Sequence, residues 1–320
     1  MLRYILKRLL WMIPIILTVA IVVFSLMSLA PGKPEEIILG SNATEEAYAV
    51  MRHNLKLDDP FLVRLARFLK NTFIDFDFGQ SWIDRTSVFG AMMEKFPRTI
   101  IMALSTFVLS YLIGIPLGIN AAIHQNRWQD SASMFVALMG ISVPSFWLAL
   151  LLVILFAVKL QWLPPMGFGG VKYYILPALA GAFSGIATSA RQTRSSMLDV
   201  IRSDYITTAR AKGVPNRQVI TKHAFRNALI PIITLMGGDL ANLLGGTMVI
   251  ETIFAIPGIG SYIVSAVGRR DYPAVQGSAL LLSIIFSIIM LVVDLIYAAA
   301  DPRIKAQYAS PSKRRKTDEA

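Results

Sequence analysis

Asp239 and Asn242 are polar side chains within an apolar run, which makes them the first candidates for chemistry in this sequence. Their spacing of three residues puts them on one face of a helix, on a polar stripe that continues to Gly246. A carboxylate at membrane depth is costly unless it faces a cavity or a partner. Asp239 could therefore line a polar pathway and meet a cationic group of a cargo, or it could hold two helices together through a hydrogen bond. Asp294 raises the same alternatives, or it lies close enough to the inner interface to be solvated.

Residues for other kinds of chemistry are missing. The histidines His53, His124 and His223 lie in separate segments without metal-binding spacing, and there is no cysteine. No nucleophile elbow is present, and Gly32-Lys33 is followed by proline rather than by the Ser or Thr of a phosphate-binding loop. We expect no metal site, no catalytic residue and no hydrolysis of nucleotide by this chain itself.

The composition is that of a polytopic membrane protein. Of the 320 residues 55% are hydrophobic and 16% charged, and the mean hydropathy is +0.57. A bilayer core needs about 20 helical residues, and the long apolar runs lack the alternation of a transmembrane barrel. The sequence therefore predicts an all-α membrane protein with six spans. We place them at Leu9–Ala30, Thr99–Ala122, Ser131–Val158 (kinked or tilted at Pro144), Tyr174–Ala190, Ala228–Ile250 and Val275–Ala300.

The net charge of +11 indicates the orientation, because basic residues of short loops gather on the cytoplasmic side next to anionic lipid. They concentrate before Leu9, between Arg191 and Arg226, and after Ala300, so both termini are predicted to be cytoplasmic. The first apolar run is too long for a signal peptide and no cleavage site follows, so we interpret it as a retained helix. The basic run Lys313–Lys316 suits a lipid surface or solvent rather than nucleic acid.

Residues 31–98 form a long outer segment with a helical pattern of its own. One face is apolar, consisting of Phe61, Leu62, Leu65, Phe68 and Leu69. Such an element could dock a partner, or it could be a packed lid.

The inner segment 191–227 predicts a basic helix–turn–helix. Ser203-Asp204 offers a helix start, Gly213 suits the position after a helix end, and Pro215 suits the start of a second helix. The apolar edges consist of Ile201, Tyr205 and Thr208 in the first helix and Val219, Ile220 and His223 in the second. The element could dock into a groove on a cytoplasmic subunit, or it could lie on anionic lipid.

The fifth span has a face of small residues, namely Thr234, Gly238, Ala241 and Gly245. Small residues at helical spacing allow a neighbouring helix to approach closely.

Asp204-Tyr205-Ile206-Thr207-Thr208-Ala209-Arg210-Ala211-Lys212-Gly213 resembles the cytoplasmic coupling loop of ABC-importer permeases. More closely, the chain resembles the dipeptide/oligopeptide permease subunits of the binding-protein-dependent peptide/nickel class. Five further blocks carry this resemblance to about Lys305: Leu29–Gly32, Phe78–Ser81, Ile256–Gly260, Asp271–Gly277 and Asp301–Ile304. Thr207 and Thr208 depart from the Glu and Ala of the general family pattern.

The resemblance implies a type I importer core with an extra N-terminal helix (1–30), an external loop element (31–98), five core helices (99–300) and a basic cytoplasmic tail (301–320). It also implies a second homologous permease subunit, two cytoplasmic ATPase subunits that bind ATP and Mg, and an extracytoplasmic substrate-binding protein, all at a bacterial or archaeal cytoplasmic membrane. The coupling residues would be Tyr205, Thr207, Thr208, Ala209, Arg210, Lys212 and Gly213, and the candidates for the translocation pathway are Asp239 and Asn242.

Di- or oligopeptides are the expected cargo, with nickel chelates, glutathione or another small solute as alternatives. Two other function classes compete with an importer subunit. A self-sufficient secondary transporter would use Asp239 and Asn242 at membrane depth, but no internal repeat is evident. An intramembrane enzyme would need a nucleophile, base or metal cluster, and none is recognisable.

Overall fold

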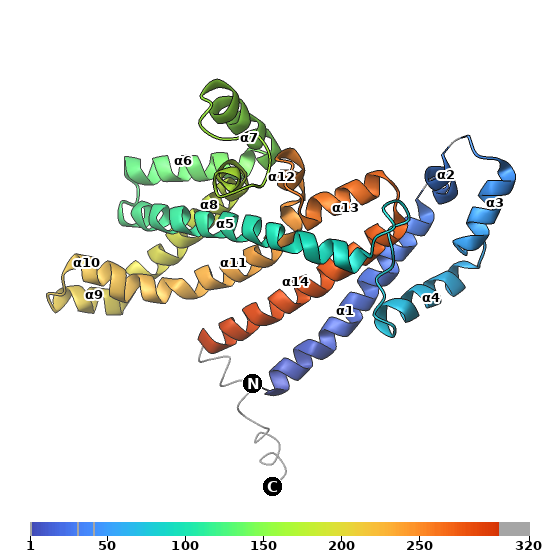
Figure 1. The fold of residues 1–320 in the computed structure, drawn as a ribbon. Coiled ribbons are helices and arrows are strands. Elements are labelled where there is room, and N and C mark those ends of the chain that lie inside the picture. The colour runs from blue at the N-terminus through green and yellow to red at the C-terminus, as the bar shows by residue number, and fades with distance from the viewer. Residues whose placement is uncertain (1, 31, 41, 301–320) are drawn as a thin grey trace, which may run out of the picture.

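The computed structural model describes residues 2–30, 32–40 and 42–300, and it is built of helices (Figure 1). Within these ranges the only β pairing is an isolated bridge between Gln80 and Ser87. The predicted tail 301–320, including Asp301–Ile304, lies outside the described residues. The helices are α1 (Leu2–Leu29), α2 (Pro34–Leu39), α3 (Glu45–Asn54), α4 (Phe61–Phe73), α5 (Val88–Ile123), α6 (Trp128–Ser142), α7 (Ser145–Leu152), η1 (Val153–Lys159), α8 (Lys172–Ile201), α9 (Asp204–Ala211), α10 (Asn216–Gln218), η2 (Val219–Ala224), α11 (Phe225–Gly246), α12 (Met248–Ile253), α13 (Ile259–Gly268) and α14 (Tyr272–Ala300).

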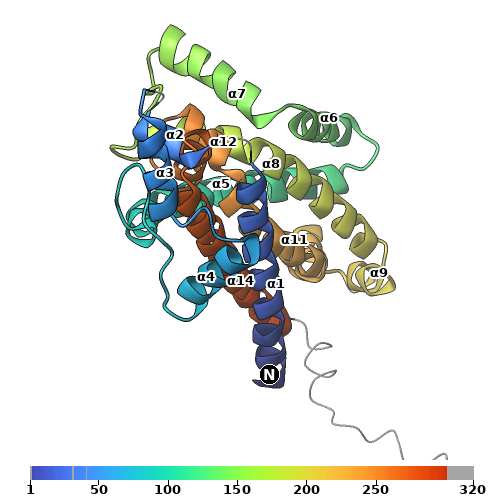
Figure 2. The same cartoon turned by 90° about the vertical axis from the view of Figure 1, so that its right-hand side faces the viewer.

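Helices α5, α8 and α11 form the centre of the bundle, and α1 packs along α14 at its side. Figures 1 and 2 show α2, α3 and α4 at one end of the molecule and the hairpin of α9 and α10 at the other. The outer and inner elements predicted from the sequence therefore lie at opposite ends of the bundle.

Glycines and small residues set the close contact between α5 and α8. A Cβ added at Gly118 would lie 2.4 Å from the backbone oxygen of Ala190, and one added at Gly185 would lie 2.3 Å from the hydroxyl oxygen of Ser110. This packing explains why the fourth predicted span is rich in Ala, Gly and Ser, since α8 is the interior helix of the bundle. It is also longer than Tyr174–Ala190, because it continues to Ile201.

The six predicted spans each correspond to helices, and the all-α architecture is confirmed. Within the described residues, three helical segments are long and apolar enough to cross a membrane: Ile5–Leu29, Val88–Ile123 and Tyr272–Leu295. The pair Trp128–Ser142 and Ser145–Lys159 would be a fourth. Helix α8 is less apolar than these segments, which fits an interior helix that is rich in small and polar residues.

The third predicted span is not one kinked or tilted helix, and that expectation was wrong. Helix α6 and the segment formed by α7 and η1 meet at a bend of 102°. Pro144 is the cause, because it lacks an N–H and disfavours the helical conformation of Val143, which is extended with φ −84° and ψ 121°. The fifth span is likewise interrupted, since α11 ends at Gly246 and α12 begins after Thr247.

The outer element is attached to α1 by aromatic packing. The ring of Phe24 lies 5.6 Å from that of Phe61 and 5.4 Å from that of Phe68, so part of the predicted apolar face of α4 does pack. Leu62, on the other hand, is 73% exposed. Helices α2 and α3 are joined by Arg52, whose guanidinium lies 2.7 Å from the carboxylate of the buried Glu35.

The close contact at Gly118 between α5 and α8 predicts that one added methyl group destabilises the fold. Gly118→Ala should lower the free energy of unfolding by about 1–3 kcal/mol, because the rigid backbone at Ala190 cannot move aside. The change is measured as a lower melting temperature in thermal unfolding of the purified protein in detergent. Gly268→Ala is the matched control, since a Cβ there meets nothing within 4 Å. Equal melting temperatures for the two variants would contradict this account of the packing.

Candidate translocation cavity and coupling hairpin

A polar cavity of about 290 Å³ lies between α5, α8 and α11, with contributions from α7 and α12. Asp239 and Asn242 are both on its wall, together with the hydroxyl-bearing residues Thr106, Ser110 and Ser184. The other lining residues are Met102, Tyr111, Ser145, Gly181, Gly185, Thr188, Leu243, Thr247 and Ile250. A wall of hydroxyls, exposed backbone and one carboxylate offers hydrogen bonds to a polar solute but no nucleophile–base pair.

Asp239 also has a partner within the bundle. The hydroxyl group of Tyr111 on α5 donates a hydrogen bond of 2.6 Å to Asp239 Oδ2, and Tyr111 itself is 5% exposed. The carboxylate therefore lies on the cavity wall and joins α11 to α5 as well, so the structure contains the features of both alternatives raised by the sequence.

In the described part of the chain, two glycines of the small-residue face of α11 have no neighbour packed against them. A Cβ added at Gly238 or Gly245 meets nothing within 4 Å, and Asn242, between them, is exposed. Close contact within the chain is made by the neighbouring Gly237, where a Cβ would lie 2.2 Å from Val293 of α14. The face that includes Gly238 and Gly245 is thus open in the isolated chain.

The inner helix–turn–helix forms at the residues that the sequence predicts. Helix α9 begins at Asp204 after an extended Ser203, although the Ser203 side chain makes no capping bond. Gly213 adopts φ +75°, in the left-handed region that favours glycine, and its N–H donates to the carbonyl of Arg210. The second helix follows Pro215 and runs through η2 into α11 without a loop.

An apolar cluster joins this hairpin to the bundle. Ile206 of α9 and Val219 of η2 are fully buried, and Ile220 is 7% exposed. They pack with Ala122 of α5, Met197 of α8, Ala224 at the end of η2 and Ala228 of α11. Of the predicted apolar edge of the second helix, Val219 and Ile220 therefore point inward, and only His223 is exposed.

The predicted coupling residues lie mostly on the outer surface of the hairpin. Tyr205 is 46% exposed, and Ala209 is half-buried in the apolar cluster. The remaining members, all exposed, are Thr207, Thr208, Arg210, Lys212 and Gly213. The hairpin thus presents an aromatic ring, hydroxyls and cations to its surroundings, with its apolar ridge turned inward.

A buried carboxylate that the sequence analysis missed lies at the other end of α11. Glu251 is fully buried and accepts hydrogen bonds from the hydroxyls of Thr99 (2.8 Å) and Thr247 (3.1 Å) and from the N–H of Ser261 (2.9 Å). Gly258 leaves room for it, since a Cβ there would lie 2.4 Å from Glu251 Oε2. The available signal was a single acid between an apolar run and the glycine-rich block Ile256–Gly260.

Two further blocks from the sequence analysis pack against each other at the outer end. Asp271 is fully buried, and it accepts hydrogen bonds from the hydroxyl of Ser81 and, at 3.1 Å, from the N–H of Trp82. Close by, both carboxylate oxygens of Asp84 bind Arg269 at 2.8 Å. The Arg269 guanidinium holds the pKa of the Asp84 carboxyl below its usual value.

Ion pairs join helices towards the inner end. Arg8 of α1 lies 2.8 Å from Asp294 of α14, which gives Asp294 a charged partner in the chain itself. Asp130 of α6 binds Arg194 of α8 through two hydrogen bonds of 2.6 and 2.7 Å.

Two family models match this chain and together cover most of it. Residues 114–306 match the binding-protein-dependent transport system inner membrane component, and residues 1–103 match the N-terminal component of the same transport systems. The boundary falls within α5, after the outer element.

Curated relatives match over nearly the whole length. The glutathione transport system permease protein GsiC of Salmonella paratyphi A is 42% identical over 95% of this chain and 99% of its own. A putative peptide transport system permease protein of Brucella abortus is 45% identical over 94% and 98%.

Solved structures show the same fold at lower identity. An inward-facing structure of the MetNI methionine ABC transporter matches with a TM-score of 0.57 and 18% identity, over 66% of this chain and 97% of that one. An amino acid ABC transporter with histidines matches with a TM-score of 0.50 and 11% identity, over 67% and 94%. This chain therefore belongs to the family of binding-protein-dependent transport system inner membrane components, the permease subunits of ABC importers.

Proposed function

We propose that this permease carries di- or oligopeptides across the cytoplasmic membrane of a bacterium or archaeon, driven by ATP hydrolysis in separate subunits. The observation that carries the proposal is the full-length match to permeases named for peptide and glutathione transport, since glutathione is itself a small peptide. A polar cavity with a single carboxylate suits a cargo rich in amide groups. Nickel chelates and other small solutes are the alternatives.

The surfaces that this chain leaves open fit the proposed partners. A second, homologous permease would pack on the face of α11 around Gly238 and Gly245 and close the cavity from the other side. Two cytoplasmic ATPases, which bind ATP and Mg, would bind the exposed residues of the hairpin, including Tyr205 and Arg210. An extracytoplasmic binding protein would deliver cargo at the end formed by the loop element 31–98.

The proposed mechanism begins at the hairpin. Closure of the ATPases on ATP would move α9, and the apolar cluster of Ile206, Val219 and Ile220 would pass this movement to α5, α8 and α11. Because those three helices line the cavity, its access would switch between the two sides of the membrane. In the orientation predicted from charge, both termini and the hairpin are cytoplasmic.

Reconstitution tests the function and the cargo together. The chain is co-expressed with the second permease and the ATPases, and the complex is placed in liposomes that contain ATP. The measurement is the uptake of a labelled tripeptide that the binding protein delivers. We expect uptake to require ATP, and unlabelled di- and tripeptides to compete more strongly than a nickel chelate. Transport by this chain alone without nucleotide would refute the proposal.

Gly213 provides a test of coupling. Gly213→Val should abolish most ATP-dependent uptake or release the ATPases during co-purification, because a β-branched residue at φ +75° is strained and would displace the turn. Gly213→Asn is the control, since asparagine tolerates this conformation. Both variants should reach the membrane in equal amounts. If the Val variant transports as well as the Asn variant, the geometry of the turn has no role in coupling.

Asp239 and Tyr111 provide a test of the pathway. If Asp239 meets a cationic group of the cargo, Asp239→Asn should reduce uptake by about tenfold or more, the effect of one charge-assisted hydrogen bond. Tyr111→Phe removes the hydrogen bond between α5 and α11 but leaves the carboxylate on the cavity wall, so it should cost much less. Uptake and thermal stability are measured for both. Equal losses in the two variants would show that Asp239 serves only to join helices.

A further inference from the structure

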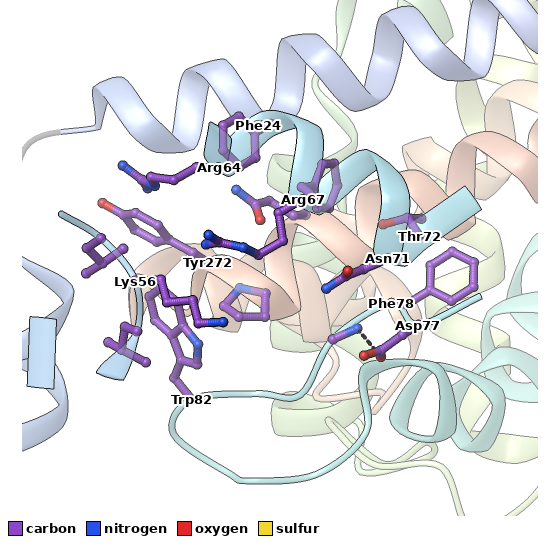
Figure 3. Close-up of a pocket in the computed structure, with 16 residues that line it drawn as sticks. Phe24, Lys56, Arg64, Arg67, Asn71, Thr72, Asp77, Phe78, Trp82 and Tyr272 are labelled. Atoms are coloured by element: carbon purple, nitrogen blue, oxygen red, sulfur yellow. Dashed lines mark hydrogen bonds between the residues drawn. The ribbon is translucent and has the colours of Figure 1, made fainter. Parts of the chain in front are cut away.

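A second pocket, at the opposite end from the hairpin, has no role in the proposed function. Its volume is about 210 Å³, and it lies between α1, α4, the loop before α5 and the start of α14. Figure 3 shows charged side chains from α4 and from the connection before it directed into this space, with Trp82 and Tyr272 as an aromatic wall.

The pocket carries more positive than negative charge. Lys56, Arg64 and Arg67 line it, and Arg67 is paired with Asp59. In the described part of the chain, neither Lys56 nor Arg64 has a carboxylate within 4 Å, and Arg64 lies over the ring of Phe24 at 5.9 Å.

Only one lining residue is acidic. Asp77 accepts a hydrogen bond of 2.9 Å from the N–H of Gly79, so one of its carboxylate oxygens already has a donor within the chain. Cationic groups that lack a carboxylate partner among the described residues can hold an anionic ligand, and oxygen-rich anions suit guanidinium and ammonium groups well.

A buried hydroxyl points to the same ligand chemistry. Thr72 lines the pocket and is 3% exposed, and its hydroxyl has no hydrogen-bond partner among the described residues. A buried polar group without a partner costs stability, and an oxygen-rich ligand could accept the hydrogen bond of this hydroxyl.

The depth of the pocket distinguishes a lipid from a soluble anion. About 20 helical residues cross the hydrocarbon core. Counted from Arg8, which is paired with Asp294 towards the inner end, that length ends at Ser28, about one turn beyond Phe24, which borders the pocket. The rings of Trp82 and Tyr272, 5.4 Å apart, are the kind of residue found at the membrane interface.

Apolar surface for acyl chains lies next to the pocket. On α1, Ile21 is 38% and Leu17 is 39% exposed, and they lie one and two turns before Phe24 on the same face of the helix. On α4, Phe61, which packs on Phe24, is 42% exposed. A headgroup in the pocket would therefore have its chains beside apolar side chains rather than in water.

We propose that this pocket binds the phosphate group of an outer-leaflet phospholipid. Lys56 and Arg64 hold the phosphate oxygens, and the acyl chains lie along the exposed apolar side of α1 and α4. The lipid thus fixes α4 of the loop element against α1. This site is independent of the cargo and of the ATPase contacts, so it stands or falls separately from the proposed function.

The test uses the purified complex in a phosphate-free maltoside detergent and measures melting temperature as ligands are added. The ligands are short-chain phosphatidylglycerol, diacylglycerol with the same chains, and glycerol 3-phosphate. The double variant Lys56→Gln/Arg64→Gln is compared with Lys70→Gln, which removes a cation from the exposed side of α4 outside the pocket.

Phosphatidylglycerol should stabilise the wild type and the Lys70→Gln variant equally. The double variant should need at least about tenfold more lipid for the same shift, since each lost charge-assisted hydrogen bond costs on this order. Diacylglycerol should not distinguish the variants. An unchanged lipid response in the double variant would overturn the proposal. So would a response to glycerol 3-phosphate equal to that of the lipid, because the ligand would then be a soluble anion.

Discussion

Burial of Ile206, Val219 and Ile220 in a single apolar cluster is the constraint on which the rest of the arrangement depends. These side chains pack against the inner ends of α5, α8 and α11, so the hairpin cannot shift without moving the helices that line the cavity. A hairpin that merely lay on lipid would need its apolar edge to face outward. The observed edge faces inward, and the exposed side is left to Tyr205 and polar residues. A rigid joint with a polar outer surface is what transmission of movement from a second protein requires.

The two ends of α11 are held in different ways. At the inner end it continues from the second helix of the hairpin, and at the outer end it stops where Thr247 and Glu251 form a buried hydrogen-bond network with Thr99 of α5. A helix of this length spans about 33 Å. Breaking a buried carboxylate network of this kind is costly, so the outer end of α11 is held firmly to α5. Asp239 lies between the two, bound to Tyr111 on the cavity wall.

The sequence predicted those features that depend on local chemistry. The positions of Gly213 and Pro215 correctly located the turn, and the long apolar runs correctly located helices. The sequence did not predict those features that depend on tertiary packing. Helical periodicity could not say which edge of the hairpin is buried, and Pro144 indicated a kink but not its angle of 102°. Glu251 was missed for two reasons. Its partners Thr99 and Ser261 are distant in sequence, and the predicted fifth span ended at Ile250, so that Glu251 fell in the predicted loop after it.

The size and lining of the cavity favour a complex in which another subunit, rather than this chain, selects the cargo. Its 290 Å³ lie at the lower edge of the roughly 300–1,000 Å³ that small-molecule pockets occupy, and α11 borders it with a face left open at Gly238 and Gly245. A second subunit across that face would bring the shared volume into the range of a short peptide. The wall consists mainly of hydroxyls, glycines and one carboxylate, which recognise amide and ammonium groups common to all peptides. Such a wall discriminates weakly between side chains. If peptides are the cargo, as proposed, specificity for particular side chains would have to be imposed before the cargo enters, by the protein that delivers it.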